Sequence, residues 1–505
     1  MGSNAQKLVK GTTARTVSFL LNAVVSFLLM PLIVHSLGNE MYGLWAVVGS
    51  FLGFYGLFDF GLSSAVQRYL SKALGKNDTN KANVIINTAF FVFIVICLLV
   101  LVFTGILAFY APQFEKVVKD LSLFRKIIVI LGASLALGFP TRVFMGVLFS
   151  HLRQDLFSLV EIIKLAVRTM LILHFLRIGH GILTLAVINL LSNILGDILT
   201  FILAKKTARY MSINFKIVDL TMIKAFGQYS IFTFVGQISD KLRFYVDNFV
   251  ISAFIGLSSV TIYSIAANLT RYFIESIACA FGTGMLLPIF SGYEAKGDYQ
   301  SIREKFISLT RISGYVSMLI GGILIIFGRA LIERWMGEKY LDAYPILLIL
   351  LIPVIIDMMQ NPSLGLLYGI SKHKFFSLSN LIEGISNLIL SLILVRKFGL
   401  IGVAVGTAIP MIIVKLFIQP IYVCRFINLN LREYYLSALI PVILKSSAIL
   451  YIFKIIVKRF IIVNYLDIAL LVLLTAVFFS VIIYFWGVNS EERKEFRKIF
   501  IKQAT

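Results

Sequence analysis

The amino-acid sequence predicts an all-α integral membrane protein with about 14 transmembrane helices, built as two six-helix parallel-repeat bundles plus two C-terminal helices. Three observations lead to this prediction. The chain has 505 residues, 59% of them hydrophobic, and its mean hydropathy is +0.91. Apolar runs of roughly 20–32 residues recur along the chain, separated by short charged loops. Short sequence patterns of the first half also return in the second half at a nearly constant offset.

Each apolar run is long enough to cross the hydrocarbon core of a bilayer as a helix. The predicted spans are residues 12–35, 42–70, 83–110, 126–150, 156–176, 182–203, 225–255, 260–290, 304–328, 345–369, 376–396, 400–424, 436–457 and 465–487. We expect an N-terminal six-helix lobe at 1–203, a cytoplasmic linker at 204–224, a C-terminal six-helix lobe at 225–430, two additional helices at 431–490 and a cytoplasmic tail at 491–505.

Lys and Arg set the predicted orientation. The formal net charge of +22 would point to nucleic acid in a soluble protein, but here the basic residues gather in alternate loops. With the N-terminus in the cytoplasm, the cytoplasmic loops and ends hold about twice as many of them as the opposite side. We therefore expect a multi-pass protein with both termini cytoplasmic and no nucleic-acid partner.

An internal repeat divides the chain. Residues 37–45 (LGNEMYGLW) match 255–263 (IGLSSVTIY) in pattern, at an offset of 218 residues. Downstream, 74–78 (LGKND) and 295–298 (AKGD) fall at nearly the same offset. Both copies have the same orientation under the predicted topology, so the repeat is parallel. Transporters are often built from such repeats, with the substrate site between the halves.

Residues 225–290 carry the strongest functional signal. Ionisable side chains at bilayer depth cost roughly 2.5–3.5 kcal/mol each, so they normally face a partner or a water-filled cavity. The two predicted spans in this stretch hold six of them: Asp240, Lys241, Arg243, Asp247, Arg271 and Glu275. The sequence therefore predicts a polar chamber inside the membrane.

Other spans carry ionisable residues as well. Glu161, Lys164 and Arg168 are spaced i, i+3, i+7 and share one helical face. Arg142 follows Pro140, a residue that kinks helices. Four acids have no cation near them in the sequence: Asp59, Asp197, Asp357 and Glu383. For each charged face, the alternative interpretation is an intramembrane ion pair that holds helices together.

Three sequence patterns carry a family resemblance. They are LGNEMYGLW at 37–45 with DFGL at 59–62 and RYL at 68–70, the Asp247 to Ala266 segment, and FGLIGVA at 398–404. The chain resembles the polysaccharide transporter (O-antigen flippase) family of the multidrug/oligosaccharidyl-lipid/polysaccharide exporter superfamily. The likeness runs across about residues 10–425, and its motifs are structural, with no catalytic signature among them.

The resemblance implies a non-enzymatic flippase of the bacterial cytoplasmic (inner) membrane, whose partners are membrane lipid, a polyprenyl-diphosphate-linked glycan and other membrane proteins of polysaccharide assembly. Arg and Lys would hold the diphosphate by charge-assisted hydrogen bonds. The candidate substrate-binding residues of a central cationic cavity are Arg142, Lys164, Arg168, Lys241, Arg243 and Arg271. The candidates for ion coupling or gating are Asp59, Asp197, Asp240, Asp247, Glu275, Asp357 and Glu383.

Motifs for ATP and metal chemistry are missing from the sequence. There is no P-loop, HExxH or CxxC pattern, and Cys97, Cys279 and Cys424 lie at unrelated spacings within apolar runs. We therefore expect no cofactor, with energy taken from an H⁺ or Na⁺ gradient or from consumption of the product. The GxxxG spacings at 49–53, 365–369 and 402–406 predict close helix packing.

Three alternatives to a flippase stay open at this point. A drug/cation antiporter of the same superfamily needs a chamber dominated by carboxylates and aromatics, whereas Arg and Lys are in excess at mid-span here. A membrane polymerase, ligase or glycosyltransferase needs a sizeable outer loop with catalytic residues, and the outer loops here are short. A scaffold without transport leaves the charges within the spans unexplained.

Overall fold

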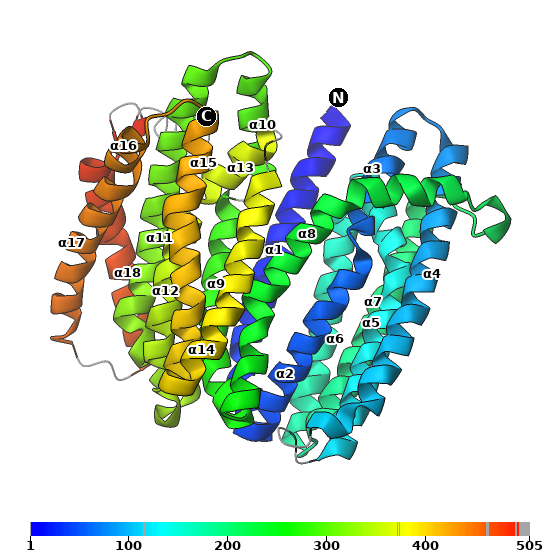
Figure 1. Cartoon of the computed structure of the whole chain (residues 1–505), viewed down its shortest axis with the longest axis horizontal. Coiled ribbons are helices and arrows are strands. Elements are labelled where there is room, and N and C mark those ends of the chain that lie inside the picture. Colours follow the sequence, from blue (N-terminus) through cyan, green and yellow to red (C-terminus); the bar gives the residue numbers. More distant parts are fainter. Residues whose placement is uncertain are drawn as a thin grey trace. The chain divides into compact units, whose positions relative to one another are not determined.

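The computed structural model describes residues 2–114, 118, 120–281, 283–370, 372, 374–460, 464–489 and 492–493. These residues form helices and no strand, which confirms the predicted all-α class. The chain divides into two compact units, unit 1 at Met1–Thr261 and unit 2 at Ile262–Thr505 (Figure 1). The lobe boundaries drawn from the sequence stay a prediction.

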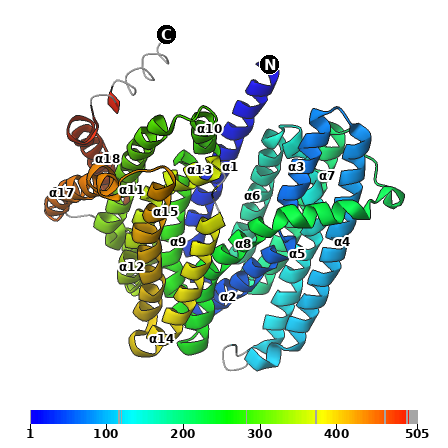
Figure 2. The same cartoon turned by 45° about the horizontal axis from the view of Figure 1, so that its top comes forward.

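Unit 1 is a bundle of long helices (Figure 2). Its elements are α1 (Gly2–Leu37), α2 (Asn39–Tyr55), the 3-10 turn η1 (Gly56–Asp59), α3 (Leu62–Gly75), α4 (Thr79–Phe109), η2 (Ala111–Phe114), α5 (Leu121–Ser150), α6 (Gln154–Arg177), α7 (Ile182–Thr207), η3 (Phe215–Ile217), α8 (Leu220–Phe254) and the first residues of α9 (Leu257–Phe281). Within it, α5 packs on α4 and α7, α6 packs on α1 and α7, and α8 packs on α2, α3 and α4.

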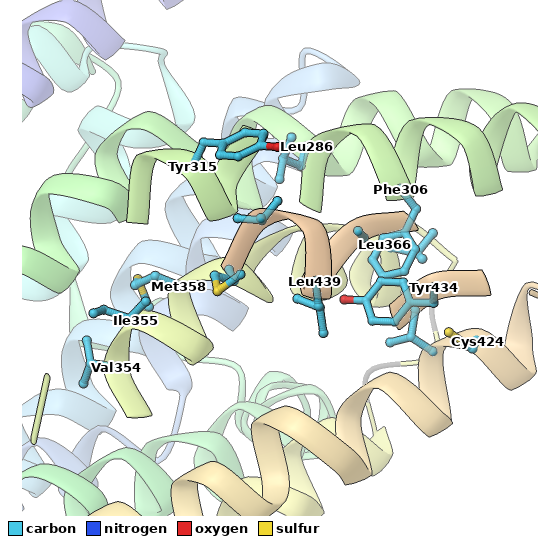
Figure 3. Packing of buried hydrophobic residues seen from close by; sticks show 14 of the residues in the cluster. Leu286, Phe306, Tyr315, Val354, Ile355, Met358, Leu366, Cys424, Tyr434 and Leu439 are labelled. Atoms are coloured by element: carbon cyan, nitrogen blue, oxygen red, sulfur yellow. The ribbon is translucent and has the colours of Figure 1, made fainter. Parts of the chain in front are cut away.

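Unit 2 holds the rest of α9 and the remaining helices. They are α10 (Thr283–Glu294), α11 (Tyr299–Met336), η4 (Glu338–Tyr340), α12 (Ala343–Met359), α13 (Asn361–Gly369), α14 (Lys374–Ile412), the π-helical η5 (Ile413–Ile418), α15 (Gln419–Phe426), α16 (Leu431–Tyr434), η6 (Tyr435–Leu439), α17 (Ile440–Val457), α18 (Tyr465–Ile482) and η7 (Ile483–Gly487). Its core contains Phe306 stacked on Tyr434, with ring centroids 5.3 Å apart (Figure 3).

The helices agree with the predicted spans. Ten segments in the described part of the chain are long and apolar enough to cross a membrane, which makes this a multi-pass membrane protein. Helices α6, α8 and α9 are not among the ten. These are the helices to which the sequence assigns most of the charges inside predicted spans.

Two predicted spans are broken helices. The span at 42–70 is interrupted by η1, where Phe60 (φ 47°) and Gly61 (φ 75°) both adopt left-handed backbone conformations. The span at 345–369 changes from α12 to α13 at Gln360, just before Pro362. Broken helices are common where transporters bind their substrates or coupling ions. The kink of α14 at Gly399 (φ 57°, ψ −133°) is different, because it lies between the predicted spans 376–396 and 400–424.

The internal repeat is visible in the backbone. Gly38 (φ 78°) precedes α2 and Gly256 (φ 127°) precedes α9, so both copies enter a helix through a glycine in a conformation that disfavours a side chain. Further on, Asn77 and Gly297 have positive φ, of 56° and 68°. The Asp that follows each of them caps a helix.

These two caps use the same geometry in both units. Asp78 Oδ1 accepts the backbone N–H of Lys81 at 2.9 Å at the start of α4. Asp298 Oδ1 accepts the backbone N–H of Ser301 at 3.0 Å at the start of α11. The recurring turn, cap and long helix show the repeat that the sequence pattern predicts.

The linker after α7 is bonded to the side chains of α4. Asn83 Nδ2 donates to Ser212 Oγ at 2.7 Å and Asn83 Oδ1 accepts the N–H of Ser212 at 3.0 Å. Asn87 donates to the Ser212 carbonyl and accepts from the Asn214 N–H, both at 2.7 Å. Thr88 Oγ1 accepts the N–H of Asp219 at 3.0 Å. This asparagine ladder fixes the linker to unit 1.

Candidate functional site

A sharp turn in unit 1 positions the first acid. Asp59 ends η1, directly before the two left-handed residues Phe60 and Gly61. Its Oδ1 accepts hydrogen bonds from the Ser63 N–H at 3.3 Å and the Ser63 hydroxyl at 2.8 Å, which ties the carboxylate to the start of α3. The side chain is only 7% exposed. The DFG letters at 59–61 therefore encode a break between two helices.

Arg142 of α5 is the partner of this carboxylate. Its Nη1 lies 3.2 Å from Asp59 Oδ1, and its guanidinium carbon lies 4.2 Å from the centroid of the Phe139 ring. Thirty per cent of the Arg142 side chain stays exposed. The cation is therefore held at one edge by a carboxylate and a ring, and a second ligand can reach its remaining N–H groups.

Helices α6 and α7 contribute the other charges. Lys164 Nζ donates to Glu161 Oε1 at 2.6 Å, as the i, i+3 spacing predicts, and these side chains are 22% and 29% exposed. Asp197 of α7 accepts the Thr141 hydroxyl at 2.8 Å. Electrostatic interactions connect Asp197 to Lys164, Glu161 and Arg142.

Three cations and three carboxylates thus come together on η1, α5, α6 and α7. Arg168 of α6 joins it through an electrostatic interaction with Glu161. We call this set of three cations and three carboxylates the ionic network of unit 1: Asp59, Arg142, Glu161, Lys164, Arg168 and Asp197. Arg142 and Lys164 are paired with carboxylates, yet both are accessible enough to exchange a carboxylate for an anionic ligand.

Helix α8 brings further predicted residues to the same turn. Gly56 of η1 lies beside Lys241, because a Cβ at Gly56 would lie 3.6 Å from Lys241 Cε. Lys241 Nζ also lies 4.6 Å from the centroid of the Tyr245 ring. Arg243 and Asp247 are buried, at 9% and 6% exposure, whereas the Asp240 side chain is exposed.

The predicted pair on α9 is only partly described. Arg271 lies in unit 2 with an exposed side chain. The side chain of Glu275 lies outside the described residues, so the i, i+4 pairing of Arg271 with Glu275 stays a prediction.

Unit 2 contains a charged cluster that the sequence analysis missed. Lys415 Nζ lies 3.3 Å from Asp357 Oδ1 and 3.8 Å from Glu383 Oε2. Asp59, Asp357 and Glu383 have no cation near them in the sequence, and the fold supplies one from another segment: Arg142 for the first, and Lys415 for the other two. The signal that could have found Lys415 was its position inside the predicted span 400–424.

Among the described residues, no group of three or more His, Cys, Asp or Glu side chains could hold a metal ion.

Comparison with known sequences gives a family match. Residues 8–294, more than half of the chain, match the family model described as "Polysaccharide biosynthesis protein". The chain is 23% identical over 420 residues to "Uncharacterized membrane protein EpsK" of Bacillus subtilis, covering 82% of each chain. It is 21% identical over 424 residues to "Putative O-antigen transporter" of Shigella flexneri, covering 82% of this chain and 97% of that one.

Comparison with solved structures supports the fold. The structure described as "Lipid II flippase MurJ, inward closed conformation" aligns with a TM-score of 0.73 and 17% identity, over 94% of this chain and 99% of that chain. An inward-facing multidrug resistance MATE family transporter of the MOP superfamily aligns with a TM-score of 0.71 and 14% identity, over 81% and 96%. These likenesses confirm the predicted transporter fold.

Proposed function

Since the chain belongs to the polysaccharide biosynthesis protein family, we propose that it is a flippase for a polyprenyl-diphosphate-linked oligosaccharide. The cargo would be a repeat unit of O-antigen, capsule or exopolysaccharide. The protein would work in the bacterial cytoplasmic membrane, with both termini in the cytoplasm, by alternating access. The named O-antigen transporter of Shigella flexneri supports this class of substrate.

One observation carries the proposal, namely that unit 1 holds partly exposed cations inside predicted membrane spans. Arg142 keeps 30% of its side chain exposed while it is paired with Asp59. Lys164 keeps 22% exposed while it is paired with Glu161. An ion pair inside a membrane protein is stable only when close geometry and further hydrogen bonds offset the desolvation of both charges. Cations that are left accessible are suited to an anionic ligand.

A diphosphate fits this network chemically. Arg142 can donate two parallel N–H groups to phosphate oxygens, and Lys164 can add a point charge from the neighbouring helix. Asp59 and Glu161 would lose their partners as the diphosphate binds and regain them as it leaves. Release then costs little, because the carboxylates re-form the original pairs. A transporter needs this reversibility, and a purely cationic pocket would lack it.

A drug/cation antiporter is the second candidate, and the three carboxylates of the ionic network favour it. A cationic substrate would pair with Asp59, Glu161 or Asp197 and displace the cations. Because the network holds as many carboxylates as cations, its composition is compatible with a cationic substrate as well as with an anionic one. The likeness to the MATE transporter shows fold alone. The family match makes the glycan flippase the stronger proposal.

The test is translocation of a fluorescent polyprenyl-diphosphate oligosaccharide in liposomes that contain the purified protein. Lys164→Ala removes one accessible cation and Arg142→Lys removes bidentate binding while keeping the charge. We expect each to lower the translocation rate at least tenfold, since each lost contact of this kind contributes about 1.5–3 kcal/mol. Arg153→Ala is the matched control, because Arg153 pairs with Asp155 outside the network.

Two outcomes would overturn the proposal. Normal translocation by both network variants at equal protein abundance would remove the network from the substrate site. Transport of a cationic dye by the wild type, lost in Glu161→Gln and unaffected by the glycan lipid, would establish the antiporter instead.

A further inference from the structure

The linker after α7 forms an apolar pocket with the side of α4, beside which it runs (Figure 1). The pocket is lined by Phe91 and Ile94 of α4 and by Phe215, Val218 and Leu220, which lead into α8. Its volume is about 550 Å³, within the range of about 300–1,000 Å³ that is usual for small-molecule pockets. None of the five lining side chains has a polar atom, so the pocket suits an apolar ligand.

The asparagine ladder holds the two walls of this pocket together. Hydrogen bonds from Asn83, Asn87 and Thr88 attach the linker at residues 212, 214 and 219 to the first turns of α4. Phe215 and Val218 lie between these attached positions. The pocket is therefore a built feature of unit 1, because specific polar contacts fix both of its walls.

The length of α4 places the pocket at the surface of the bilayer. Helix α4 has 31 residues and is about 46 Å long, whereas the hydrocarbon core is about 30 Å thick. Exposed apolar side chains follow one face of the helix at Phe91, Val95, Leu98, Val102 and Ile106. From Phe91 to its end the helix rises about 28 Å, which matches the hydrocarbon core. Phe91 therefore marks one edge of the hydrocarbon, and the ladder residues before it lie at the level of the lipid headgroups.

Two lysines lie at the same level as the pocket. Lys216 follows Phe215 in η3, and its side chain is exposed. Lys81, which is also exposed, has an electrostatic interaction with Asp219, the residue that follows Val218. The Asp219 carboxylate is already engaged, because its Oδ1 accepts the N–H and the hydroxyl of Thr221 at 2.9 and 2.6 Å. An anionic headgroup at this level therefore has two ammonium groups beside it.

We propose that this pocket, which we call the linker pocket, binds one anionic membrane phospholipid. An acyl chain lies against Phe91, Phe215 and Leu220, and the phosphate lies beside Lys81 and Lys216. Phospholipid is the occupant that the position favours, because Phe91 belongs both to the pocket and to the face of α4 that lies in hydrocarbon. The charge of the two lysines selects an anionic headgroup over a neutral one.

The exposure of the lining residues agrees with such an occupant. Phe91, Phe215 and Leu220 are 38%, 52% and 68% exposed, and apolar side chains left open to water at this density are unfavourable. An acyl chain covers them and contacts α4 and the linker at the same time. The binding of this lipid goes beyond the proposed transport function and does not depend on the cargo.

The experiment uses phospholipids with brominated acyl chains, which quench tryptophan fluorescence on contact. Full-length Phe215→Trp protein is reconstituted into phosphatidylcholine vesicles that contain a rising fraction of brominated phosphatidylglycerol or of brominated phosphatidylcholine. The signal of the new tryptophan is the difference from the wild type, which has three tryptophans. We expect half-maximal quenching by phosphatidylglycerol at a mole fraction at least about fivefold lower, because one lysine near an anionic lipid contributes about that factor in binding.

Matched variants separate a lipid site from ordinary contact with the bilayer. Val102→Trp is the control, because Val102 lies further along the same face of α4 and is 61% exposed, so both brominated lipids should quench it alike. Lys216→Gln or Lys81→Gln, added to Phe215→Trp, should reduce the preference for phosphatidylglycerol, and so should high salt. Leu220→Trp reports from a second residue of the pocket and should show the same preference, which guards against a local defect of the first variant.

Three outcomes would overturn the proposal. Equal quenching of Phe215→Trp and Leu220→Trp by the two lipids would show bulk bilayer at the pocket and no lipid site. A preference that survives both lysine substitutions would remove the phosphate from Lys81 and Lys216. Displacement of brominated phosphatidylglycerol by a small amount of polyprenyl phosphate would identify the isoprenoid tail of a cargo lipid as the occupant instead.

Discussion

The ionic network of unit 1 and the charged cluster of unit 2, which is formed by Asp357, Glu383 and Lys415, differ in how far their cations are buried. In the network, Arg142 and Lys164 keep 30% and 22% of their side chains exposed. In the charged cluster, Lys415 lies near two carboxylates and is 1% exposed. The cations of the network are accessible, whereas the lysine of the cluster is enclosed.

This difference in burial has an energetic consequence. An accessible network can exchange its internal partners for a large anion. The carboxylates of the enclosed cluster have little access to water, so their stability should depend more strongly on the ammonium of Lys415.

The largest expected effect tests the difference in burial between Lys415 and Lys164. Lys415→Ala leaves two buried carboxylates without their ammonium and should lower the free energy of unfolding by about 3–5 kcal/mol. Lys164→Ala breaks a partly exposed pair and should cost less than about 1 kcal/mol. Thermal unfolding of both variants in the same detergent measures this. Equal losses would show that the two clusters do not differ in burial energetics.

A second substitution tests how closely α8 packs against α2 at Gly53. A Cβ at Gly53 would lie 2.5 Å from Cε1 of the Tyr245 ring, whose face holds Lys241. Gly53→Ala should cost about 1–3 kcal/mol through overpacking and should slow translocation by displacing Lys241. Gly49→Ala is the control, because a Cβ there meets nothing within 4 Å. If both variants melt like the wild type, α2 and α8 are not packed this tightly.

Binding of an anionic ligand provides a further test of the difference between the two clusters. Inorganic pyrophosphate should bind the ionic network and raise the free energy of unfolding by about 1.4 kcal/mol at ten times its Kd. The shift should disappear in Lys164→Ala and persist in Lys415→Met. Differential scanning fluorimetry measures it, with sulfate at matched ionic strength as the control. A shift abolished by Lys415→Met instead would place the anion in unit 2.

The smallest effect concerns the repeated helix caps. Hydrogen bonds from Ser301 hold the pKa of Asp298 below its ordinary value, so the folded state binds this proton less readily than the unfolded chain. The cap therefore adds stability above the unfolded pKa and loses it as pH falls through the folded pKa. Asp298→Asn should lower the melting temperature slightly at neutral pH and not at strongly acidic pH. A constant difference at all pH values would contradict this linkage.

Much of the fold could be predicted because it depends on local patterns. Continuous apolar runs give the spans, and the recurring glycines before α2 and α9 give the repeat. Two GxxxG predictions are confirmed as close packing: Cβ atoms at Gly365 and Gly406 would meet Leu286 and Ser391 at 2.5 Å. Of the glycines at 49 and 53, only Gly53 is closely packed, because a Cβ at Gly49 would meet nothing within 4 Å.

The candidate sites were less predictable, because most of their ion pairs join residues that lie far apart in the sequence. Glu161 and Lys164 pair across one helical turn, which a sequence pattern can predict. Asp59 and Arg142 come from different helices, as do Asp357, Glu383 and Lys415. Pairing of this kind depends on helix packing, so the sequence shows the charges without their partners. The break at η1 was not predicted either, because the hydropathy of the sequence stays high across it.

The asparagine ladder has a consequence for how the protein is made. Asn83 and Ser212 are 129 residues apart, so the ribosome must add the whole intervening chain before these groups can meet. Until then the amides of α4 stay hydrated or bound to the insertion machinery. The hydrogen bonds of the ladder can therefore form only after α4 to α7 and the linker have been synthesised. A nascent chain arrested shortly before residue 212 should remain protease-sensitive, and one arrested well after residue 219 should not.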